Sequence, residues 1–193
     1  MMDKRQIRAE AIRRRQGIPA DKAETLSEGV RRNVEALPEY SRAKVIASYV
    51  AKDREAGTRR LIEGALAGRK TVLVPKSHKE TADLTFHALS SLSELRTGEF
   101  GVLEPPEGSE AVALDRADLV LVPVVAWDYG GGRLGYGKGY FDRGLKKKGK
   151  AISVGLAFES QRRDALPQGP MDVQLDMIVT EERVIRFGRA SFA

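Results

Sequence analysis

The chain has 193 residues, of which 41% are hydrophobic and 31% are charged, and its formal net charge is +6. This length and composition predict one globular domain spanning residues 1–193, and the chain has neither an apolar run near the roughly 18 residues of a membrane span nor the apolar segment of a secretory signal. The absence of cysteine excludes disulfides, thiol nucleophiles and thiolate metal sites and fits a cytoplasmic location.

The first 100 residues alternate predicted helices with short apolar strands. A helix is predicted from its cap at Asp3 to Gln16. A second helix is predicted to begin at Asp21, where Glu24 would complete a capping box, and to stop at Pro38. The other elements predicted in this part are strands over 44–50, 71–75 and 84–89, a helix over 58–66 and a short helix over 91–95.

The most apolar segment, "DLVLVPVVAWD" (118–128), is predicted to form a central strand with Pro123 near its end. A glycine-rich segment follows it, and after that come a predicted helix over 140–149, a strand over 151–158 and a pair of short strands over 177–180 and 184–187. Strands that are apolar on both faces and alternate with helices indicate an α/β fold. We therefore predict a single three-layer α-β-α domain with a mostly parallel central sheet, Rossmann-like in its layout.

The glycine-rich segment "GGGRLGYGKGYFDRG" (130–144) places seven glycines in fifteen positions between a strand and a helix. In open α/β sheets, ligands bind where loops leave the carboxyl ends of strands, and a helix N-terminus attracts anions. Glycine lets the backbone approach a phosphate without a clash from Cβ. The segment therefore predicts a phosphate-binding loop, and the alternative is a purely structural glycine turn.

Two familiar phosphate-binding patterns match this segment only in part. "GGGRLG" satisfies G-x-G-x-x-G but lies late in the chain, and "GRLGYGK" resembles a P-loop in which glycine replaces the serine or threonine that follows the lysine. We therefore expect a loop of another kind, with a bare backbone and nearby cations. The residues expected to form it are the glycines Gly135, Gly137 and Gly139 and the cations Arg133 and Lys138.

Asp142, four residues after Lys138, is a candidate metal ligand. In a chain with no cysteine and two histidines, carboxylates must hold any metal, which favours Mg²⁺. The alternative is that Asp142 complements the helix dipole or pairs with Lys138.

Two other classes of protein remain open from the residues alone. Basic residues gather in the N-terminal helix and in "LKKKGK" (145–150), which suits a protein that binds nucleic acid, but aromatic residues make up only 6% and no nucleic-acid-binding module is present. The "GGGRLG" pattern leaves open an oxidoreductase that depends on a dinucleotide.

The segment "RLGYGKGYFDR" (133–143), after "VPVVAWD" (122–128), closely resembles the most distinctive stretch of the 5-formyltetrahydrofolate cyclo-ligases, also called methenyltetrahydrofolate synthetases. The family pattern runs roughly R-L-G-x-G-K-G-Y-Y-D. The resemblance extends over nearly the whole chain, and its supporting elements are Lys4 and Arg8 in a K-x-x-x-R element, "EAGT" (55–58), "FGVLEP" (100–105) and "DVQLDMIVTEE" (172–182).

The resemblance implies an ATP- and Mg²⁺-dependent ligase of one-carbon metabolism. Such an enzyme converts 5-formyltetrahydrofolate to 5,10-methenyltetrahydrofolate and releases ADP and phosphate, by phosphorylation of the formyl oxygen and attack by N10. Because phosphoryl transfer asks a protein mainly for positioning and charge neutralisation, no Cys, Ser or His nucleophile is needed. The implied partners are ATP and 5-formyltetrahydrofolate, without nucleic acid or membrane, and the chain is expected to be a monomer or a weak homodimer.

The resemblance also implies a role for individual residues. Catalysis would fall to Lys138, Arg133 and Tyr140. ATP would be bound by Lys4, Arg5, Gln6, Ile7 and Arg8 and by Arg133, Leu134, Gly135, Tyr136, Gly137, Lys138, Gly139, Tyr140 and Phe141. The folate would be bound by Glu55, Tyr136, Gly137, Lys138, Gly139 and Tyr140.

In this assignment the carboxylate of Glu55 would match paired N–H donors on the pterin edge, and the alternative is that Glu55 is an ordinary loop acid. Mg²⁺ would be held by Asp142 and Asp172, with Asp176 as the competitor of Asp172. Trp127 and Phe86 would either pack on the pterin or belong to the core.

Overall fold

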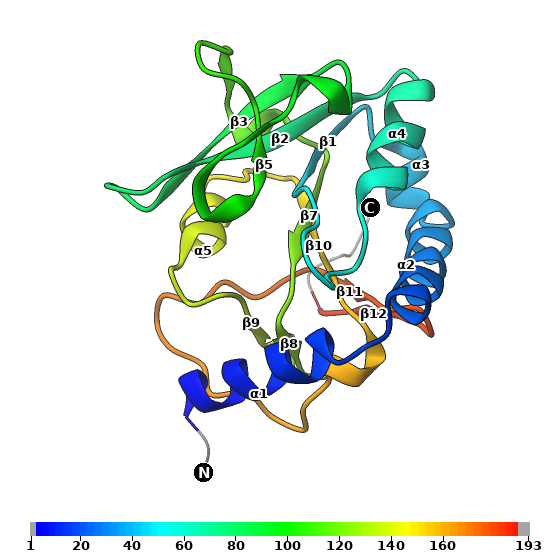
Figure 1. Cartoon of the computed structure of the whole chain (residues 1–193), viewed down its shortest axis with the longest axis vertical. Helices are drawn as coiled ribbons and strands as arrows, with labels where there is room; N and C mark the ends of the chain where they lie inside the picture. Colours follow the sequence, from blue (N-terminus) through cyan, green and yellow to red (C-terminus); the bar gives the residue numbers. More distant parts are fainter. Residues whose placement is uncertain (1–2, 189–193) are drawn as a thin grey trace.

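A computed structural model describes residues 3–188, and its centre is one eight-stranded sheet (Figure 1). The strands of this sheet are β1 (Val45–Ser48), β2 (Thr71–His78), β3 (Asp83–Leu89), β6 (Ala111–Val112), β7 (Leu119–Pro123), β10 (Ile152–Leu156), β11 (Met177–Val179) and β12 (Val184–Arg186). Their order is β12-β11-β10-β7-β1-β2-β3-β6. The five strands from β11 to β2 run parallel, whereas β12 and β3 run antiparallel to their neighbours and β6 pairs antiparallel with β3.

The helices of the described residues are α1 (Lys4–Gln16), α2 (Ala20–Glu35), α3 (Pro38–Arg42), α4 (Arg59–Ala67) and α5 (Tyr140–Leu145), with short 3-10 turns at Leu92–Glu94, Glu99–Gly101, Leu114–Arg116 and Glu159–Gln161. Two short ladders lie outside the main sheet, β4 (Arg96–Thr97) with β5 (Leu103–Glu104) and β8 (Ala126–Trp127) with β9 (Arg133–Leu134). None of the helices between residues 3 and 188 combines the length and the apolar character needed to cross a membrane.

The parallel strands are apolar on both faces because successive side chains of a strand point in opposite directions. In β7, Leu119 and Leu121 face the cluster that includes Val34 of α2, whereas Val120 and Val122 face the cluster that includes Leu145 of α5. Helices therefore cover both faces, which confirms the predicted three-layer α/β fold with a mostly parallel sheet.

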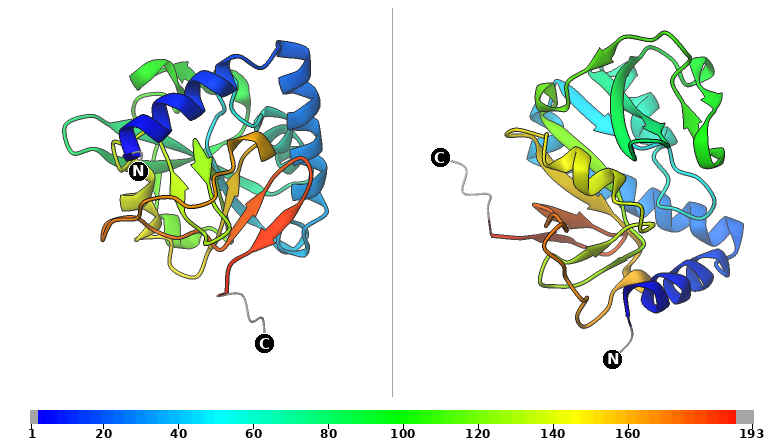
Figure 2. Two further views of the ribbon diagram at one scale, coloured as in Figure 1. Left: turned by 90° about the horizontal axis from the view of Figure 1, so that it is seen from below. Right: turned by 90° about the vertical axis from the view of Figure 1, so that its left-hand side faces the viewer.

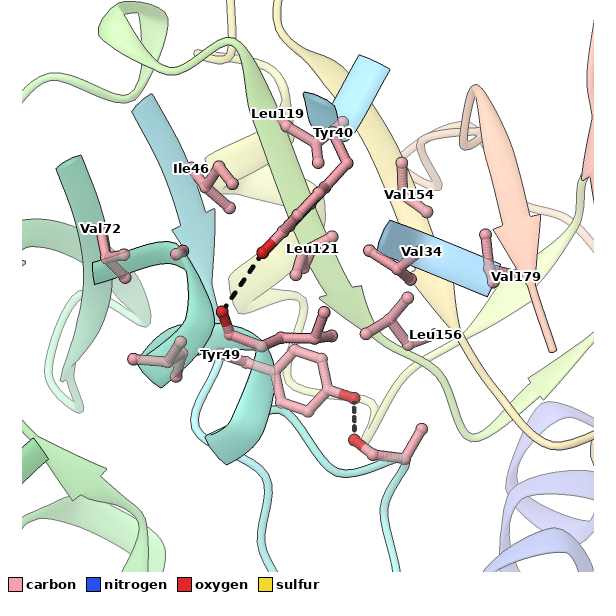
Figure 3. Close-up of a cluster of buried hydrophobic side chains, with 14 of the residues drawn as sticks. Val34, Tyr40, Ile46, Tyr49, Val72, Leu119, Leu121, Val154, Leu156 and Val179 are labelled. Carbon is pink, nitrogen blue, oxygen red and sulfur yellow. Dashed lines mark hydrogen bonds between the residues drawn. The ribbon is translucent and has the colours of Figure 1, made fainter. Parts of the chain in front are cut away.

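Two buried tyrosines donate hydrogen bonds within the hydrophobic cluster that includes Val34 of α2 (Figure 3). The hydroxyl of Tyr40 donates to the carbonyl oxygen of Leu61 at 3.4 Å, and the hydroxyl of Tyr49 donates to that of Ala56 at 2.6 Å. A buried hydroxyl needs such a partner, since an unsatisfied one costs free energy. The first bond joins α3 to α4, and the second fastens the loop after β1 to the end of that strand.

Helix α1 belongs to neither covering layer. Figures 1 and 2 show it, in dark blue, next to the β8–β9 ladder and beyond the end of β7. Ile7 and Ala11 of α1 pack with Val125, Ala126 and Leu134 in a third buried cluster. The apolar side of α1 thus holds the helix across the carboxyl-terminal edge of the sheet, where it can form one wall of a ligand site.

The predicted strand over 118–128 is too long. Strand β7 ends at Pro123, and the chain then leaves the sheet to form β8. Val124, Val125, Ala126 and Trp127 are nevertheless buried, because α1 and the loop after β10 cover this second segment. The residues after Pro123 are therefore apolar because other elements bury them, and not because the strand continues.

The predicted helix ends needed three corrections. Helix α2 begins at Ala20 after Pro19 and has no side-chain cap, so the capping box of Asp21 and Glu24 is wrong. The helix ends at Glu35, and Pro38 does not stop it but begins α3, as the fixed φ of proline suits a first helical turn. Helix α5 ends at Leu145 rather than near 149, where Gly149 takes a φ of 58°.

The first helix is confirmed with its cap at Asp3 and its end at Gln16, and the other predicted elements are confirmed with shifted bounds, the short helix over 91–95 as a 3-10 turn. The strand predicted over 84–89 is β3, and it pairs antiparallel with β2, which the pattern did not indicate. The two strands predicted near the C-terminus are β11 and β12, of which β11 joins the parallel set.

A glycine in α2 tests the packing of this helix on the sheet. A Cβ added at Gly29 would lie 2.9 Å from Cβ and 3.2 Å from Cα of Glu181, so Gly29→Ala is expected to lower the free energy of unfolding by about 1–3 kcal/mol through overpacking. Gly64→Ala in α4 is the matched control, because its Cβ would meet only a carboxylate oxygen of Glu35 at 3.7 Å, and helix propensity predicts a gain of about 0.5–1 kcal/mol. Urea unfolding followed by the fluorescence of the buried Trp127 measures both, and equal effects would contradict the close contact.

Candidate functional site

A cavity of about 530 Å³ lies at the carboxyl-terminal ends of β1, β2 and β7. Tyr49 and Val50 follow β1, Pro123 ends β7, and the residues from Arg133 to Asp142 cover the cavity from the other side. The open ends of parallel strands are where α/β proteins bind their ligands. The fold therefore places the glycine-rich segment where the sequence predicted a site.

Positive charge exceeds negative charge in the lining of this cavity. The lining has seven cationic side chains, Lys4, Arg8, Lys52, Arg133, Lys138, Arg143 and Lys146, and four carboxylates, Glu55, Glu104, Asp142 and Asp172. A partly enclosed surplus of one sign attracts ligands of the opposite sign. Apolar and aromatic side chains complete the wall, among them Leu84, Phe100, Val102, Tyr136 and Tyr140. The cavity thus suits a ligand set with both a polyanion and a flat ring system.

The glycine-rich segment divides into two parts with different tasks. Its first part is the turn between β8 and β9, where the N–H groups of Gly130 and Gly132 donate to Oδ1 of the buried Asp128 at 2.9 and 2.8 Å. Oδ2 of Asp128 accepts from the N–H of Leu166 at 2.7 Å. The N–H groups of Gly130 and Gly132 thus bind a carboxylate of the chain itself, and no helix begins directly after this turn. The structure therefore contradicts a dinucleotide-binding site at "GGGRLG".

The second part, Gly135 to Gly139, lines the cavity and is held by α1. The Nε of Arg8 donates to the carbonyl oxygen of Gly135 at 2.6 Å. Gly137 has a φ of 95°, and a Cβ added there would lie 2.9 Å from Cζ of Arg8. The loop must therefore be bare at Gly137 both for its backbone conformation and for the close approach of the Arg8 guanidinium.

Lys138 extends from this loop toward Phe100 on the opposite wall. Its Nζ lies 3.9 Å from the centroid of the Phe100 ring, and the edge of Tyr140 packs on the same ring with centroids 5.9 Å apart. A cation over an aromatic face is attracted only weakly compared with an ion pair. Among residues 3–188 Lys138 forms no ion pair, so the alternative in which it pairs with Asp142 is wrong, whereas Asp142 does lie in the first turn of α5, as the helix-dipole alternative requires. The charge of Lys138 is thus open to an anionic ligand.

Asp142 and Asp172 both line the cavity, and each is bound to a cation of the chain. The Nη2 of Arg133 donates to Oδ1 of Asp142 at 2.6 Å, and the N–H of Val173 donates to the same oxygen at 3.1 Å. Lys4 pairs with Asp172. Burial acts to raise the pKa of Asp172, but the hydrogen bonds from Lys4 and from the N–H of Gly169 bring it below its ordinary value.

The carboxylates present fit Mg²⁺ only together with a ligand. Within the described part of the chain, no three His, Cys, Asp or Glu side chains form a cluster that could hold a metal ion. Mg²⁺ in proteins is commonly held by one or two carboxylates together with substrate phosphates. The donor set of Asp142 and Asp172 suits this shared mode, and it does not suit a metal site formed by the protein alone.

Glu55, from the loop after β1, lies buried at the far wall of the cavity. Its Oε1 accepts from the hydroxyl of Tyr136 at 2.6 Å, and its Oε2 accepts from the N–H of Lys52 at 2.8 Å. Burial raises the pKa of Glu55, and the hydrogen bonds from Tyr136 and Lys52 and the charge of Arg15 oppose this rise. Burial and the neighbouring Glu55 also raise the pKa of Tyr136.

Arg15 is a contributor to the site that the sequence analysis did not single out. It is buried at the end of α1, and its Nη2 donates to the hydroxyl of Tyr136 at 2.6 Å. The spacing of Lys4, Arg8 and Arg15 is that of one helix face, since residues four and seven apart lie on the same side. That spacing was the signal by which this residue could have been found.

The structure brings most of the predicted site residues together. Those that line the cavity are Lys4, Arg8, Glu55, Arg133, Leu134, Gly135, Tyr136, Gly137, Lys138, Gly139, Tyr140, Phe141, Asp142 and Asp172. Their roles in binding and catalysis stay predictions. Lys52, Phe100 and Glu104 also line the cavity and were assigned no role from the sequence.

Six other candidates do not reach the cavity. Arg5 is exposed, Gln6 caps its own helix with Asp3, and Ile7 belongs to the buried cluster beneath α1. Asp176 accepts hydrogen bonds from Lys148 and Ser153, away from the cavity, which leaves Asp172 as the second candidate metal ligand. Trp127 and Phe86 are buried in one core cluster and do not line the cavity, so they belong to the core rather than to a ring-binding surface.

Comparison with known proteins adds an independent finding. Residues 1–181 match the sequence model of the 5-formyltetrahydrofolate cyclo-ligase family. The chain is 33% identical to the 5-formyltetrahydrofolate cyclo-ligase of Haemophilus influenzae over 181 residues, which are 91% of this chain and 97% of the relative. It is 29% identical to the corresponding protein of Escherichia coli K12 over 175 residues, which are 89% and 96% of the two chains.

A solved structure is similar over the same extent. The NMR structure of the Aquifex aeolicus 5,10-methenyltetrahydrofolate synthetase superposes with a TM-score of 0.86 and 34% sequence identity, over 100% of this chain and 97% of that chain. Fold and sequence therefore agree on one family.

The contact between Arg8 and Gly137 can be tested without any ligand. Gly137→Ala is expected to lower the free energy of unfolding by about 1–2 kcal/mol because of the positive φ, and to speed amide hydrogen exchange in α1 because its Cβ displaces Arg8. Gly108→Ala is the control, since Gly108 has a φ of 78° with nothing within 4 Å of an added Cβ. If both variants leave exchange in α1 unchanged, Arg8 does not fasten α1 to the loop.

Proposed function

This chain belongs to the 5-formyltetrahydrofolate cyclo-ligase family, and we propose that it converts 5-formyltetrahydrofolate to 5,10-methenyltetrahydrofolate with ATP as co-substrate and Mg²⁺ as the metal, releasing ADP and phosphate. The observation that carries the proposal is the position of one loop, Gly135 to Gly139, between two different surroundings. On one side it contacts the cations of α1, and on the other Tyr136 reaches the buried Glu55. A reaction that transfers a phosphoryl group to a ring substrate requires the two ligands to bind next to each other.

We place the phosphates of ATP on the side of the loop that faces α1. Backbone N–H groups freed from Cβ atoms and a nearby lysine are the usual means of holding phosphate oxygens. Lys138 supplies a point charge without an ion-pair partner among residues 3–188, and Arg8 and Lys4 add two more cations from one helix face. If Lys4 bound a phosphate, it would leave Asp172, and the carboxylate of Asp172 would then be free of its ion pair.

We place the pterin of the folate beside Glu55. A carboxylate can accept two parallel N–H bonds, and each oxygen of Glu55 has one protein donor and therefore keeps accepting capacity. Tyr136, Tyr140 and Phe100 supply aromatic surface at the adjoining wall. This arrangement fixes one edge of the ring system and leaves the formyl group directed to the loop.

The chemistry asks for a better leaving group than the formyl oxygen offers. A formamide carbonyl is a weak electrophile, and its oxygen does not leave as hydroxide. Transfer of the γ-phosphoryl group breaks its bond to ADP and forms a bond to the formyl oxygen. N10 then attacks the formyl carbon, the C–O bond breaks with phosphate as leaving group, and N10 loses its proton.

The residues of the loop act in this scheme by position and charge. Phosphoryl transfer gains most from preorganised cations and N–H donors around the transferred group. Lys138 and Arg133 would face the oxygens of that group, and the hydroxyl of Tyr140 would border the formyl oxygen. Mg²⁺ held by Asp142, Asp172 and the phosphates would offset further negative charge.

The alternative of a nucleic-acid-binding protein is not favoured by the arrangement of α1. Lys4 and Arg8 turn to the cavity, Arg15 is buried, and Arg14 pairs with Glu10. The helix therefore offers no continuous basic face to a phosphate backbone.

Turnover of the wild-type protein with ATP, Mg²⁺ and 5-formyltetrahydrofolate tests the proposal, because the methenyl product is read by its near-ultraviolet absorbance. Lys138→Ala is expected to abolish this signal while leaving the protein folded, since the main phosphate cation is lost. Lys150→Ala, which removes an exposed lysine outside the cavity, is the control and keeps its activity. Normal turnover by Lys138→Ala would refute the role given to Lys138, and no turnover by wild-type protein would refute the proposed function.

The buried carboxylate predicts a pH dependence. Only ionised Glu55 accepts two N–H bonds, so kcat/KM for 5-formyltetrahydrofolate is expected to fall as pH drops through the pKa of Glu55, which burial raises above 4.5. Glu55→Gln should lower kcat/KM at pH 7 about tenfold or more and remove this acidic limb. Glu63→Gln, at an exposed position of α4, should change neither. An acidic limb that persists in Glu55→Gln would assign it to another group.

A further inference from the structure

A chain of three polar groups, of which the two outer ones are buried and the middle one is 41% exposed, links the end of α1 to the ring-binding side of the cavity. It runs from the guanidinium of Arg15 through the hydroxyl of Tyr136 to the carboxylate of Glu55, and both of its hydrogen bonds are 2.6 Å long. The three residues come from α1, from the glycine loop and from the loop after β1. The Cζ of Arg15 also lies 5.7 Å from the centroid of the Tyr136 ring.

The direction of the hydroxyl proton follows from the chemistry of the two neighbours. A guanidinium has donors only, so the oxygen of Tyr136 must accept from Arg15. The single proton of this hydroxyl is then left for Glu55, whose ionised carboxylate only accepts. A protonated Glu55 would have to turn its own proton elsewhere, so this arrangement favours the ionised acid.

The burial of Arg15 gives a second argument. Its side chain has no carboxylate within ion-pair distance among residues 3–188, its Nη1 reaches only the carbonyl oxygen of Val124 at 3.4 Å, and its Nε has no partner. A buried charge is tolerated when an opposite charge compensates it. Glu55 is the acid one hydroxyl away, and the charge of Arg15 acts to lower its pKa.

We propose that Arg15 is a positioning residue for folate recognition, because it directs the Tyr136 hydroxyl to Glu55 and so keeps this carboxylate ionised and oriented toward the pterin edge. Arg15 does not line the cavity and acts through Tyr136. The inference rests on the proposed function in one respect only, the identity of the ring that Glu55 binds.

The charged and titratable groups that face Glu55 come from all the elements packed around it. They are Arg15 from α1, Tyr136 from the glycine loop, and Tyr49 and Lys52 from the segment after β1. Lys52 and Arg15 both favour the charged acid, and Tyr49 gives its hydroxyl to Ala56 instead. Removing Arg15 leaves one of the two cations, so the pKa of Glu55 is expected to rise further.

Arg15→Leu and Arg14→Leu form a matched pair of variants. Both remove one positive charge from the last turn of α1, but Arg14 is exposed and pairs with Glu10. Arg15→Leu is expected to raise KM for 5-formyltetrahydrofolate about tenfold or more and to leave KM for ATP within about twofold. It should also move the acidic limb of kcat/KM to higher pH. Arg14→Leu should change none of these values, and Arg15→Lys, which keeps a donor and a charge, should restore part of the loss.

Tyr136→Phe provides a second test that leaves α1 intact, in case Arg15→Leu folds poorly. It is expected to raise KM for the folate to a similar extent, and the double variant should be no worse than either single variant, because both break the same chain of bonds. Additive effects would show that Arg15 does not act through Tyr136.

A titration of the free protein separates this inference from the proposed function. The ¹³C carboxyl resonance of Glu55, identified by its loss in Glu55→Gln, should titrate at higher pH in Arg15→Leu than in wild-type protein, and this needs no substrate. An unchanged titration, or equal rises of both KM values with a lowered melting temperature, would overturn the inference and leave Arg15 a purely structural residue. If the titration shifts but the wild-type protein shows no turnover, the proposed function and the role of Arg15 in folate recognition are overturned. The effect of Arg15 on the ionisation of Glu55 would still be supported.

Discussion

The close approach of Arg8 to the bare backbone at Gly137 is the contact on which the arrangement of the site depends. The guanidinium occupies the space that a side chain at position 137 would need, and it also donates to the carbonyl oxygen of Gly135. Helix α1 is not part of the layered fold, and this contact holds it at the cavity together with the small cluster around Ile7 and the polar contacts of Lys4 and Arg15. Glycine at position 137 is therefore favoured by its φ of 95°, and it also leaves room for the Arg8 guanidinium, which an added Cβ would displace.

Three cations of the same helix, Lys4, Arg8 and Arg15, lie along one face. Lys4 and Arg8 meet the cavity near the two aspartates and the glycine loop, and Arg15 meets the Tyr136 hydroxyl at the other end. Every one of these cations already has a partner in the protein, and Arg133 is likewise bound to Asp142. Lys138 differs, because its only close neighbour is the face of Phe100. The cavity is thus partly organised before any ligand enters, and the lysines in its lining that form no ion pair among residues 3–188, Lys52, Lys138 and Lys146, remain for a new anion.

Sequence reasoning reached the layered fold and the position of the loop because both depend on local patterns. Strands apolar on both faces and a glycine run between a strand and a helix can be recognised in short windows. Sequence reasoning failed where contacts between segments distant in the sequence determine the structure. The run over 118–128 stays apolar after leaving the sheet because α1 covers it, and Gly130 and Gly132 serve Asp128 rather than a phosphate. Arg15 was missed because a buried arginine in a basic helix resembles its exposed neighbours, although its position seven residues after Arg8 places it on the same helix face.

In the proposed reaction, the loop from Gly135 to Gly139 binds the terminal phosphates of ATP next to the formyl group of the folate. A crystal structure with a non-hydrolysable ATP analogue, Mg²⁺ and 5-formyltetrahydrofolate would locate both ligands at once. We expect the β- and γ-phosphates within hydrogen-bond distance of the loop N–H groups and of Nζ of Lys138, with the pterin edge on Glu55. A triphosphate bound away from this loop, or a pterin that leaves Glu55 untouched, would overturn the proposal.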